Sequence, residues 1–379
     1  MKIVFIGEAI SGFGGMETVI RNVIHTLRTP PFSAECKIFF FCRNNSMDKN
    51  WLNNIDDHYS ISNIKLSALR RAKHIRALSD WLTREQPDAV IAIDPLSCLY
   101  ASRARKKSNN HFTLFSWPHF SLEHKKHAQY ITCADYHLAI SSGIRQQMIS
   151  RGVPEKNIHV IYNPTDKTST VIPGPAQGAV PTFIYVGRLK FEGQKRVKDL
   201  LDGFSRVPGR WKLHIIGDGS DAGQCKAYAQ ELCIDGRISW HGWQAEPWKI
   251  VQDEIGQVTA LLLTSSFEGF PMTLLEAMAR GIPCISADCV SGPGDIILPG
   301  VNGYLYPPGD LGELSALISA MISGEKALDH AVIPASIEPF YAESYYHRLN
   351  DILCAYSHTP TLSPREREKS RTRLTTVME

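Results

Sequence analysis

The sequence lacks any apolar run long enough to span a membrane. Apolar stretches such as residues 89–93 and 259–263 are far shorter than the ~20 residues that a membrane-spanning helix needs. The start of the chain also lacks the long apolar core and the small-residue cleavage site of a secretion signal. These absences favour a cytoplasmic protein.

Three cofactor-binding patterns are missing as well. The 9 cysteines are scattered without a Cys-x-x-Cys pair, which favours reduced thiols over a zinc site or a disulfide framework. No Asp-x-Asp occurs, so the carboxylate pair that would hold a divalent cation against a diphosphate is absent. Residues 12–15 do not form Gly-x-Gly-x-x-Gly, which disfavours a dinucleotide-dependent dehydrogenase. We expect no cofactor and no metal ion.

Charge is distributed unevenly along the chain. Residues 1–165 carry 21 basic and 13 acidic side chains, whereas residues 166–357 carry 15 basic and 22 acidic ones. The excess of basic residues in 1–165 indicates that this part of the chain has an anionic partner. No basic motif with interleaved aromatic residues is present, so we expect no binding of nucleic acid.

Apolar runs and helical stretches alternate in two series. The first predicts strands at 2–6, 37–41, 89–93 and 112–116, with helices at 16–27, 64–84 and 95–107. The second begins at residue 183, after a segment rich in Pro, Gly, Ser and Thr that is typical of a linker (165–182). The pattern predicts an α/β protein with two Rossmann-like, doubly wound domains and a cleft between them at the carboxyl ends of the strands.

The predicted domains span residues 1–165, for acceptor binding, and residues 166–338, for donor binding. A helix within 339–357 is expected to cross back to the first domain. Residues 358–379 show no apolar periodicity and are expected to be disordered.

The most specific motif runs from Ser265 to Ala279 and begins where a predicted strand ends. Gly269 permits a tight turn, and Pro271 lies near the start of a predicted helix. Free amides at such a helix start can hold a diphosphate. Glu268, in the loop, can reach a sugar hydroxyl, and Glu276, within the helix, can accept hydrogen bonds from a ribose.

This Glu268–Glu276 pair resembles the E-x7-E motif of the GT-B family of retaining glycosyltransferases (the family 4 type). Further motifs resemble that family in order and spacing: Gly14-Gly15, residues 160–164, residues 185–189 with Lys195, and residues 215–219. The resemblance covers residues 1 to about 356. It implies a GT-B fold and metal-independent transfer with retention of configuration, in which the acceptor attacks on the face of the leaving group.

The resemblance also implies roles for individual residues. Arg188 and Lys195 would bind the diphosphate, although their spacing leaves Lys190, Arg196 and Lys198 as rivals to Lys195. The remaining UDP-binding positions would be Gly14, Gly15, Gly217, Trp243, Thr273, Leu274 and Glu276. The donor-sugar positions would be His119, Glu268, Gly269, Phe270 and Pro271, with His119, Arg188, Lys195 and Glu268 acting in catalysis. For Trp243, a place in the core is a competing interpretation.

Taken whole, the chain resembles members that transfer galactose from UDP-galactose to a glucose of the lipopolysaccharide core through a 1,6-linkage. UDP-glucose and UDP-N-acetylglucosamine remain alternative donors. Galactose and glucose differ only in the C4 hydroxyl, and one pocket residue can determine which of the two configurations is accepted. A UDP-sugar 2-epimerase of the same fold is an alternative activity.

A lipid-anchored acceptor suggests a peripheral location on the anionic inner face of the cytoplasmic membrane. Basic stretches at 69–76 and 101–107 are the predicted docking surface, with Leu66, Leu69, Ile75 and Leu78 facing the sheet.

Overall fold

Two separate parallel sheets organise the chain. The structure is a computed structural model, which describes residues 1–9, 15–44, 50–52, 54–108 and 110–357. One compact unit, unit 1, holds residues 1–164 and the chain from residue 343 onward, and the other, unit 2, holds Thr165–Ala342. The chain therefore passes from unit 1 to unit 2 and back again.

The sheet of unit 1 has seven strands in the order β3-β2-β1-β4-β5-β6-β7, and all of its pairs are parallel. The strands are β1 Lys2–Glu8, β2 Glu35–Cys42, β3 Asp56–Ile61, β4 Ala89–Ala92, β5 Thr113–Ser116, β6 Tyr136–Ala139 and β7 Ile158–Val160. Strand order reverses between β1 and β4. Such a switch point opens a crevice at the carboxyl ends of the strands, where ligands bind in folds of this type.

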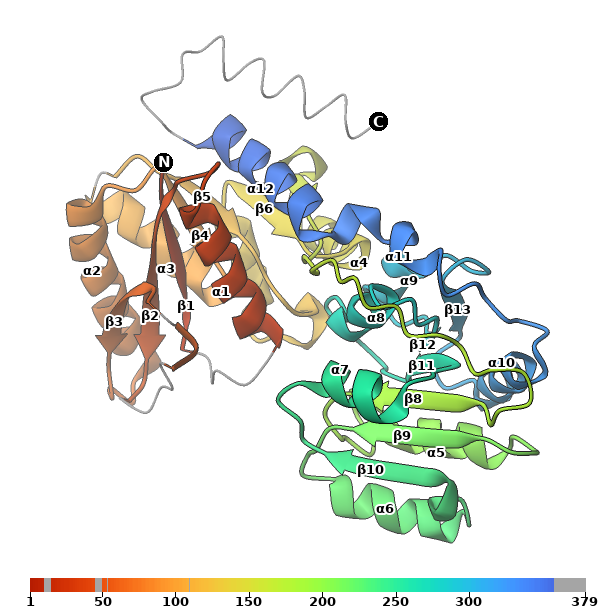
Figure 1. Ribbon diagram of the computed structural model, residues 1–379. Helices are drawn as coiled ribbons and strands as arrows, with labels where there is room; N and C mark the ends of the chain where they lie inside the picture. The colour runs from red at the N-terminus through yellow and green to blue at the C-terminus, as the bar shows by residue number, and fades with distance from the viewer. Residues whose placement is uncertain (10–14, 45–49, 53, 109, 358–379) are drawn as a thin grey trace. The chain divides into compact units, whose positions relative to one another are not determined.

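Helices connect several of these strands (Figure 1). They are α1 Gly15–Arg28, α2 Ser67–Glu85, α3 Pro95–Ser108 and α4 Ser142–Ser150. Helices α2 and α3 pack over one face of the sheet, where Leu78 and Leu82 meet Phe39. The last described helix, α12 Ala342–Tyr356, packs on unit 1, since Thr113 Oγ1 donates to the Tyr356 carbonyl at 2.6 Å.

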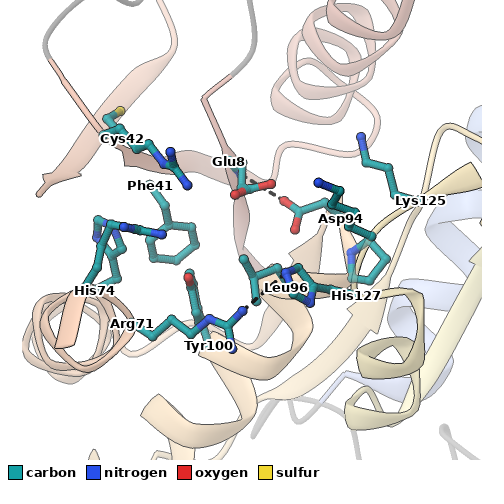
Figure 2. Close-up of a pocket in the computed structure, with 14 residues that line it drawn as sticks. Glu8, Phe41, Cys42, Arg71, His74, Asp94, Leu96, Tyr100, Lys125 and His127 are labelled. Atoms are coloured by element: carbon teal, nitrogen blue, oxygen red, sulfur yellow. Dashed lines mark hydrogen bonds between the residues drawn. The ribbon is translucent and has the colours of Figure 1, made fainter. Parts of the chain in front are cut away.

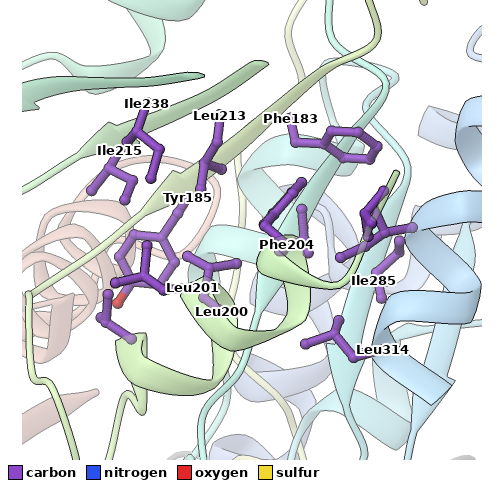
Figure 3. Packing of buried hydrophobic residues seen from close by; sticks show 14 of the residues in the cluster. Phe183, Tyr185, Leu200, Leu201, Phe204, Leu213, Ile215, Ile238, Ile285 and Leu314 are labelled. Carbon is purple, nitrogen blue, oxygen red and sulfur yellow. The ribbon is translucent and has the colours of Figure 1, made fainter. Parts of the chain in front are cut away.

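The sheet of unit 2 has six parallel strands in the order β10-β9-β8-β11-β12-β13. They are β8 Thr182–Val186, β9 Lys212–Ile216, β10 Ile238–Gly242, β11 Ala260–Leu263, β12 Cys284–Ala287 and β13 Gly303–Tyr306. The helices are α5 Val197–Ser205, α6 Ala222–Glu231, α7 Pro247–Ile250, α8 Met272–Met278, α9 Pro293–Ile296, α10 Leu311–Ser323 and α11 Ile333–Ser336. Figure 3 shows side chains of α5 and α10 packed against this sheet, around Phe183 and Phe204. Here the switch point lies between β8 and β11.

Most predicted elements are present, with informative differences. Strand β3 begins with Asp56 and Asp57 and carries no apolar run, so periodicity did not predict it. The predicted helix at 64–84 begins only at Ser67. The predicted linker packs on unit 2, because the Ile172 amide donates to the Arg280 carbonyl at 2.8 Å.

Among the described residues, no helix is both long and apolar enough to cross a membrane.

Candidate functional site

The switch point of unit 2 brings two loops together. One follows β8 (residues 187–196) and the other follows β11 (residues 264–271). The Ser266 amide donates to the Gln194 carbonyl at 2.8 Å, and Ser266 Oγ donates to the Gly193 carbonyl at 2.7 Å. Thr264 Oγ1 donates to the Lys195 carbonyl at 3.0 Å. These bonds hold the basic loop and the Glu268 loop side by side.

Lys195 and Glu268 form an ion pair across these loops. Lys195 Nζ lies 2.6 Å from Glu268 Oε1, and the two side chains are 20% and 9% exposed. Ser291 Oγ donates to the Glu268 carbonyl, which fixes the loop from the β12 side. A cation and a carboxylate are therefore held together in a site that excludes most water.

The rival basic residues are engaged elsewhere. Lys190 pairs with Asp221 at 3.2 Å, and Arg196 pairs with Asp199 at 2.6 Å. Lys198 lies 4.0 Å from Glu192 on the surface. Of the four candidates, Lys195 is the one whose side chain meets the Glu268 loop. The geometry thus favours Lys195 despite its unusual spacing from Arg188.

Arg188 follows β8 directly and is exposed. Tyr185 Oη donates to its carbonyl at 2.9 Å, which anchors the backbone. Within the described ranges no carboxylate pairs with the Arg188 guanidinium. Its charge is open to an anionic ligand.

Position 217 requires glycine, because the backbone of Gly187 approaches it closely. The φ of Gly217 is +143°, and a Cβ there would lie 1.9 Å from the Gly187 carbonyl oxygen. The Gly187 amide also donates to the Ile216 carbonyl at 3.0 Å. Gly217 therefore packs the turns after β8 and β9 against each other, a role that the sequence alone did not reveal.

The segment after Glu268 combines residues that pack in the core with amides at the start of helix α8. Phe270 is buried, with its ring centroid 5.7 Å from that of Phe340. Pro271 precedes helix α8, and the Leu274 amide donates to its carbonyl at 3.1 Å. The amide of Leu274 is thus already bonded, which leaves Thr273 as the freer amide of the predicted pair.

Glu276 lies in a polar pocket of about 440 Å³. Trp248 Nε1 donates to Glu276 Oε2 at 2.9 Å, and the Arg280 guanidinium lies 4.9 Å from the centre of the Trp248 ring. Burial raises the pKa of Glu276, against the opposing effects of the Trp248 bond and the Arg280 charge. Trp248 was not predicted, because nothing in the sequence joins it to a residue 28 positions away.

Trp243 is 69% exposed. The competing interpretation of this residue as part of the core is therefore wrong. The ring is available as a surface for stacking, which buried tryptophans are not.

In unit 1, His119 has an unusual environment. Both ring nitrogens are buried without a hydrogen-bond partner among the described residues. The ring packs edge-on against Trp117, with the two ring centroids 4.1 Å apart. Burial lowers the pKa of His119 to about 3, so the imidazole is neutral at pH 7. A buried polar group without a partner is costly, and a ligand hydroxyl would satisfy it.

Two further predictions concern the start of α1 and metal binding. Gly15 is the first residue of helix α1, whereas Gly14 lies outside the described residues. In the part of the chain that the structure covers, no group of three His, Cys, Asp or Glu side chains is placed to hold a metal ion.

Two details of the predicted basic docking surface are wrong. Arg105 binds Asp135 at 2.5 Å and the Phe112 carbonyl at 2.9 Å, so it fastens α3 to the sheet rather than facing solvent. Leu66 and Leu69, predicted to face the sheet, are instead 61% and 56% exposed. They fail to reach the core because helix α2 begins late and buries its other face.

Two Rossmann-like units, each with a parallel sheet and a switch point at the carboxyl ends of its strands, are the architecture of the GT-B glycosyltransferases. A family model described as "Glycosyltransferase Family 4" matches residues 13–169, and one described as "Glycosyl transferases group 1" matches residues 173–336. The chain belongs to this family of glycosyltransferases, as its motifs predicted.

Within the family, it is 64% identical over 353 residues to the lipopolysaccharide 1,6-galactosyltransferase of Escherichia coli K12, covering 93% of this chain and 98% of the relative. The enzyme of the same name from Salmonella typhimurium is 59% identical over the same shares of the two chains. A solved structure, "lipopolysaccharide outer core galactosyltransferase WaaB apo form", matches with a TM-score of 0.91 and 58% identity. That match covers 94% of this chain and 99% of the other.

Proposed function

We propose that this enzyme transfers galactose from UDP-galactose to a glucose of the lipopolysaccharide core, forming a 1,6-linkage. The observation that carries the proposal is 64% identity along almost the whole length of a relative named lipopolysaccharide 1,6-galactosyltransferase. The fixed pair of Lys195 and Glu268 supports it, because a diphosphate leaving group needs a preorganised cation.

In unit 2, Arg188 and Lys195 hold the diphosphate and stabilise the charge that develops as UDP departs. Glu276 accepts hydrogen bonds from the ribose, and Trp243 stacks beside the uracil. Glu268 accepts a hydrogen bond from the donor sugar. The backbone of Gly269 and Thr273 completes this set.

In unit 1, we assign His119 to a hydroxyl of the donor sugar and the Gly15 amide to the diphosphate. A neutral imidazole can both donate and accept, which suits a sugar hydroxyl. The reaction retains the configuration of the donor sugar and uses no metal ion, because Arg188 and Lys195 supply the positive charge that a divalent cation supplies elsewhere.

The test is incubation with radiolabelled UDP-galactose, UDP-glucose or UDP-N-acetylglucosamine, each with core-truncated lipopolysaccharide. Label from UDP-galactose should enter the acceptor, EDTA should leave the rate unchanged, and linkage analysis should find an α-1,6-galactose. Release of a free altered sugar together with UDP would identify a 2-epimerase instead. Loss of activity in EDTA would refute metal independence.

We also propose that unit 1 docks on the anionic face of the inner membrane. The support is an exposed apolar group, Ile61, Ile64, Leu66 and Leu69, which are 37–61% exposed and have exposed Lys65 and Lys73 beside them. Apolar side chains that dip into the headgroup region and lysines that meet anionic lipids are the two contributions of peripheral binding.

Sedimentation with anionic and neutral liposomes across a salt series checks this surface. Leu66→Ser with Leu69→Ser should weaken binding at every salt concentration, whereas Lys65→Ser with Lys73→Ser should weaken it mainly at low salt. Leu298→Ser with Val301→Ser, two exposed apolar residues of unit 2, is the matched control. Unchanged binding of both unit 1 variants would show that another surface docks.

A further inference from the structure

A second pocket, of about 380 Å³, lies at the switch point of unit 1. Its floor comes from the ends of β1, β2 and β4, and its walls come from α2, α3 and residues 125–127. Figure 2 shows the carboxylates of Glu8 and Asp94 next to each other, with Lys125 near Asp94 and Arg71 beside His127. None of the residues assigned above to the donor lines it.

The rim of this pocket is strongly cationic. The basic residues that line it are Arg43, Arg70, Arg71, Lys125 and Lys126, against the two carboxylates of Glu8 and Asp94. The neighbouring His74 adds no charge at pH 7, because burial lowers its pKa to about 4. An excess of guanidinium and ammonium groups around a small cavity favours an anionic ligand, and arginine forks match phosphate oxygens.

The cations are positioned rather than free. One guanidinium nitrogen of Arg70 donates to the Ile64 carbonyl at 2.7 Å, and Arg71 lies 3.3 Å from His127 Nε2. Each arginine therefore keeps further N–H groups for a ligand. Holding two adjacent arginines by their other contacts lowers the entropy that is lost on binding.

The two carboxylates differ in what they can do. Asp94 accepts hydrogen bonds from the Glu8 amide at 2.8 Å, the Ser97 amide at 2.9 Å and Ser97 Oγ at 2.7 Å, so it is committed to the start of α3. No described residue donates a hydrogen bond to the Glu8 carboxylate. Glu8 is therefore the acceptor that remains for ligand hydroxyls.

Aromatic rings complete the cavity. Phe41 and Tyr100 line it with their ring centroids 4.7 Å apart. Aromatic surface beside a hydroxyl acceptor suits the C–H face and the hydroxyl edge of a sugar. Free phosphate would use the cations alone, whereas a phosphorylated sugar uses all three features.

From this arrangement we infer that the unit 1 pocket binds a phosphorylated sugar of the acceptor. Arg70, Arg71 and Lys126 hold the phosphate, and Glu8 holds sugar hydroxyls. The inference rests on the proposed transferase function, to which it adds a requirement for phosphate on the acceptor. This site selects acceptors that have already been phosphorylated, so a phosphoryl-transfer reaction must precede galactose transfer.

Calorimetry with the full chain and deacylated core oligosaccharide tests the site without lipid and without turnover. The oligosaccharide is used as isolated and after its phosphate has been removed with hydrofluoric acid. Arg70→Gln with Arg71→Gln should weaken binding of the native oligosaccharide about 10–100-fold, the loss expected for one or two charge-assisted hydrogen bonds. Wild type should bind the dephosphorylated oligosaccharide about as weakly as the variant binds the native one. Removing the phosphate should lower the affinity of the variant little further.

One control and two further variants complete the design. Arg76→Gln removes an exposed arginine of the same helix, 4.0 Å from Asp80 and outside the pocket, and should change nothing. Lys126→Gln, an exposed position, should reproduce part of the loss without a folding cost. Glu8→Gln should weaken both forms of the oligosaccharide equally.

Equal affinity of wild type for the two oligosaccharides would overturn the inference. The inference would also fail if inorganic phosphate bound as tightly as the oligosaccharide. It would fail as well if the variant of Arg70 and Arg71 lost binding to anionic vesicles but kept its affinity for the oligosaccharide. Phosphate-dependent binding without any galactose transfer would instead refute the proposed function and leave the pocket assignment standing.

Discussion

Replacing Lys195 by methionine separates its structural role from its role in catalysis. The change keeps the length of the side chain but leaves the Glu268 carboxylate, 9% exposed, without its cation at 2.6 Å. Breaking a fully buried ion pair costs about 3–5 kcal/mol. Because Lys195 is itself 20% exposed, we expect about 2 kcal/mol here, seen as a lower melting temperature by about 4–8 °C.

Turnover should fall further than this loss of stability explains. Removing one preorganised group that stabilises developing charge lowers kcat by about 10²–10³-fold. The KM for UDP-galactose should change less, because the cation matters most as the diphosphate departs. The assay is initial-rate kinetics at a temperature where circular dichroism shows the variant to be folded.

A double variant distinguishes the two roles. Lys195→Met with Glu268→Gln removes the unpaired charge, so the melting temperature should recover while kcat stays low. Lys190→Met is the matched control, because this lysine pairs with Asp221 away from the Glu268 loop. The reasoning is refuted if the double variant regains wild-type turnover, or if Lys190→Met is the more damaging single change.

Glu276→Gln should weaken UDP binding about 10–100-fold by removing charge-assisted bonds to the ribose; calorimetry should find a smaller loss for 2′-deoxy-UDP, and equal losses would exclude the ribose contact. Burial lowers the pKa of His137 and of His159 to about 4. Their neutral forms therefore stabilise the fold fully above about pH 6.5. As the pH falls from there toward 4, each histidine should lower the free energy of unfolding by about 1.4 kcal/mol per pH unit. Urea unfolding at several pH values measures this, and His159→Phe should flatten the curve. Gly217→Ala should cost roughly 3 kcal/mol, since its Cβ would meet the Gly187 carbonyl, whereas Gly223→Ala, in open space within α6, should be neutral or slightly stabilising; equal melting temperatures would contradict the close approach.

The sequence by itself determined the fold class and the donor motif. Buried parallel strands are continuous apolar runs, so residues 89–93 and 183–186 were recognisable without any tertiary contact. Glu268 and Glu276 lie in one strand–loop–helix unit, and local spacing therefore identified them together. Strand β3 was not predicted, because its pairing with β2, and not its own sequence pattern, makes it a strand.

Only the tertiary structure decided which distant residues meet. Four basic residues in the segment 190–198 are equivalent in sequence, and the folded loop joins Lys195 to Glu268 while the others find different carboxylates. Trp248 reaches Glu276 from another element, and Leu66 is exposed because α2 starts after it. The unit 1 pocket gathers side chains from Glu8 to His127, which share no motif, because parallel strands bring their carboxyl ends to one edge of the sheet.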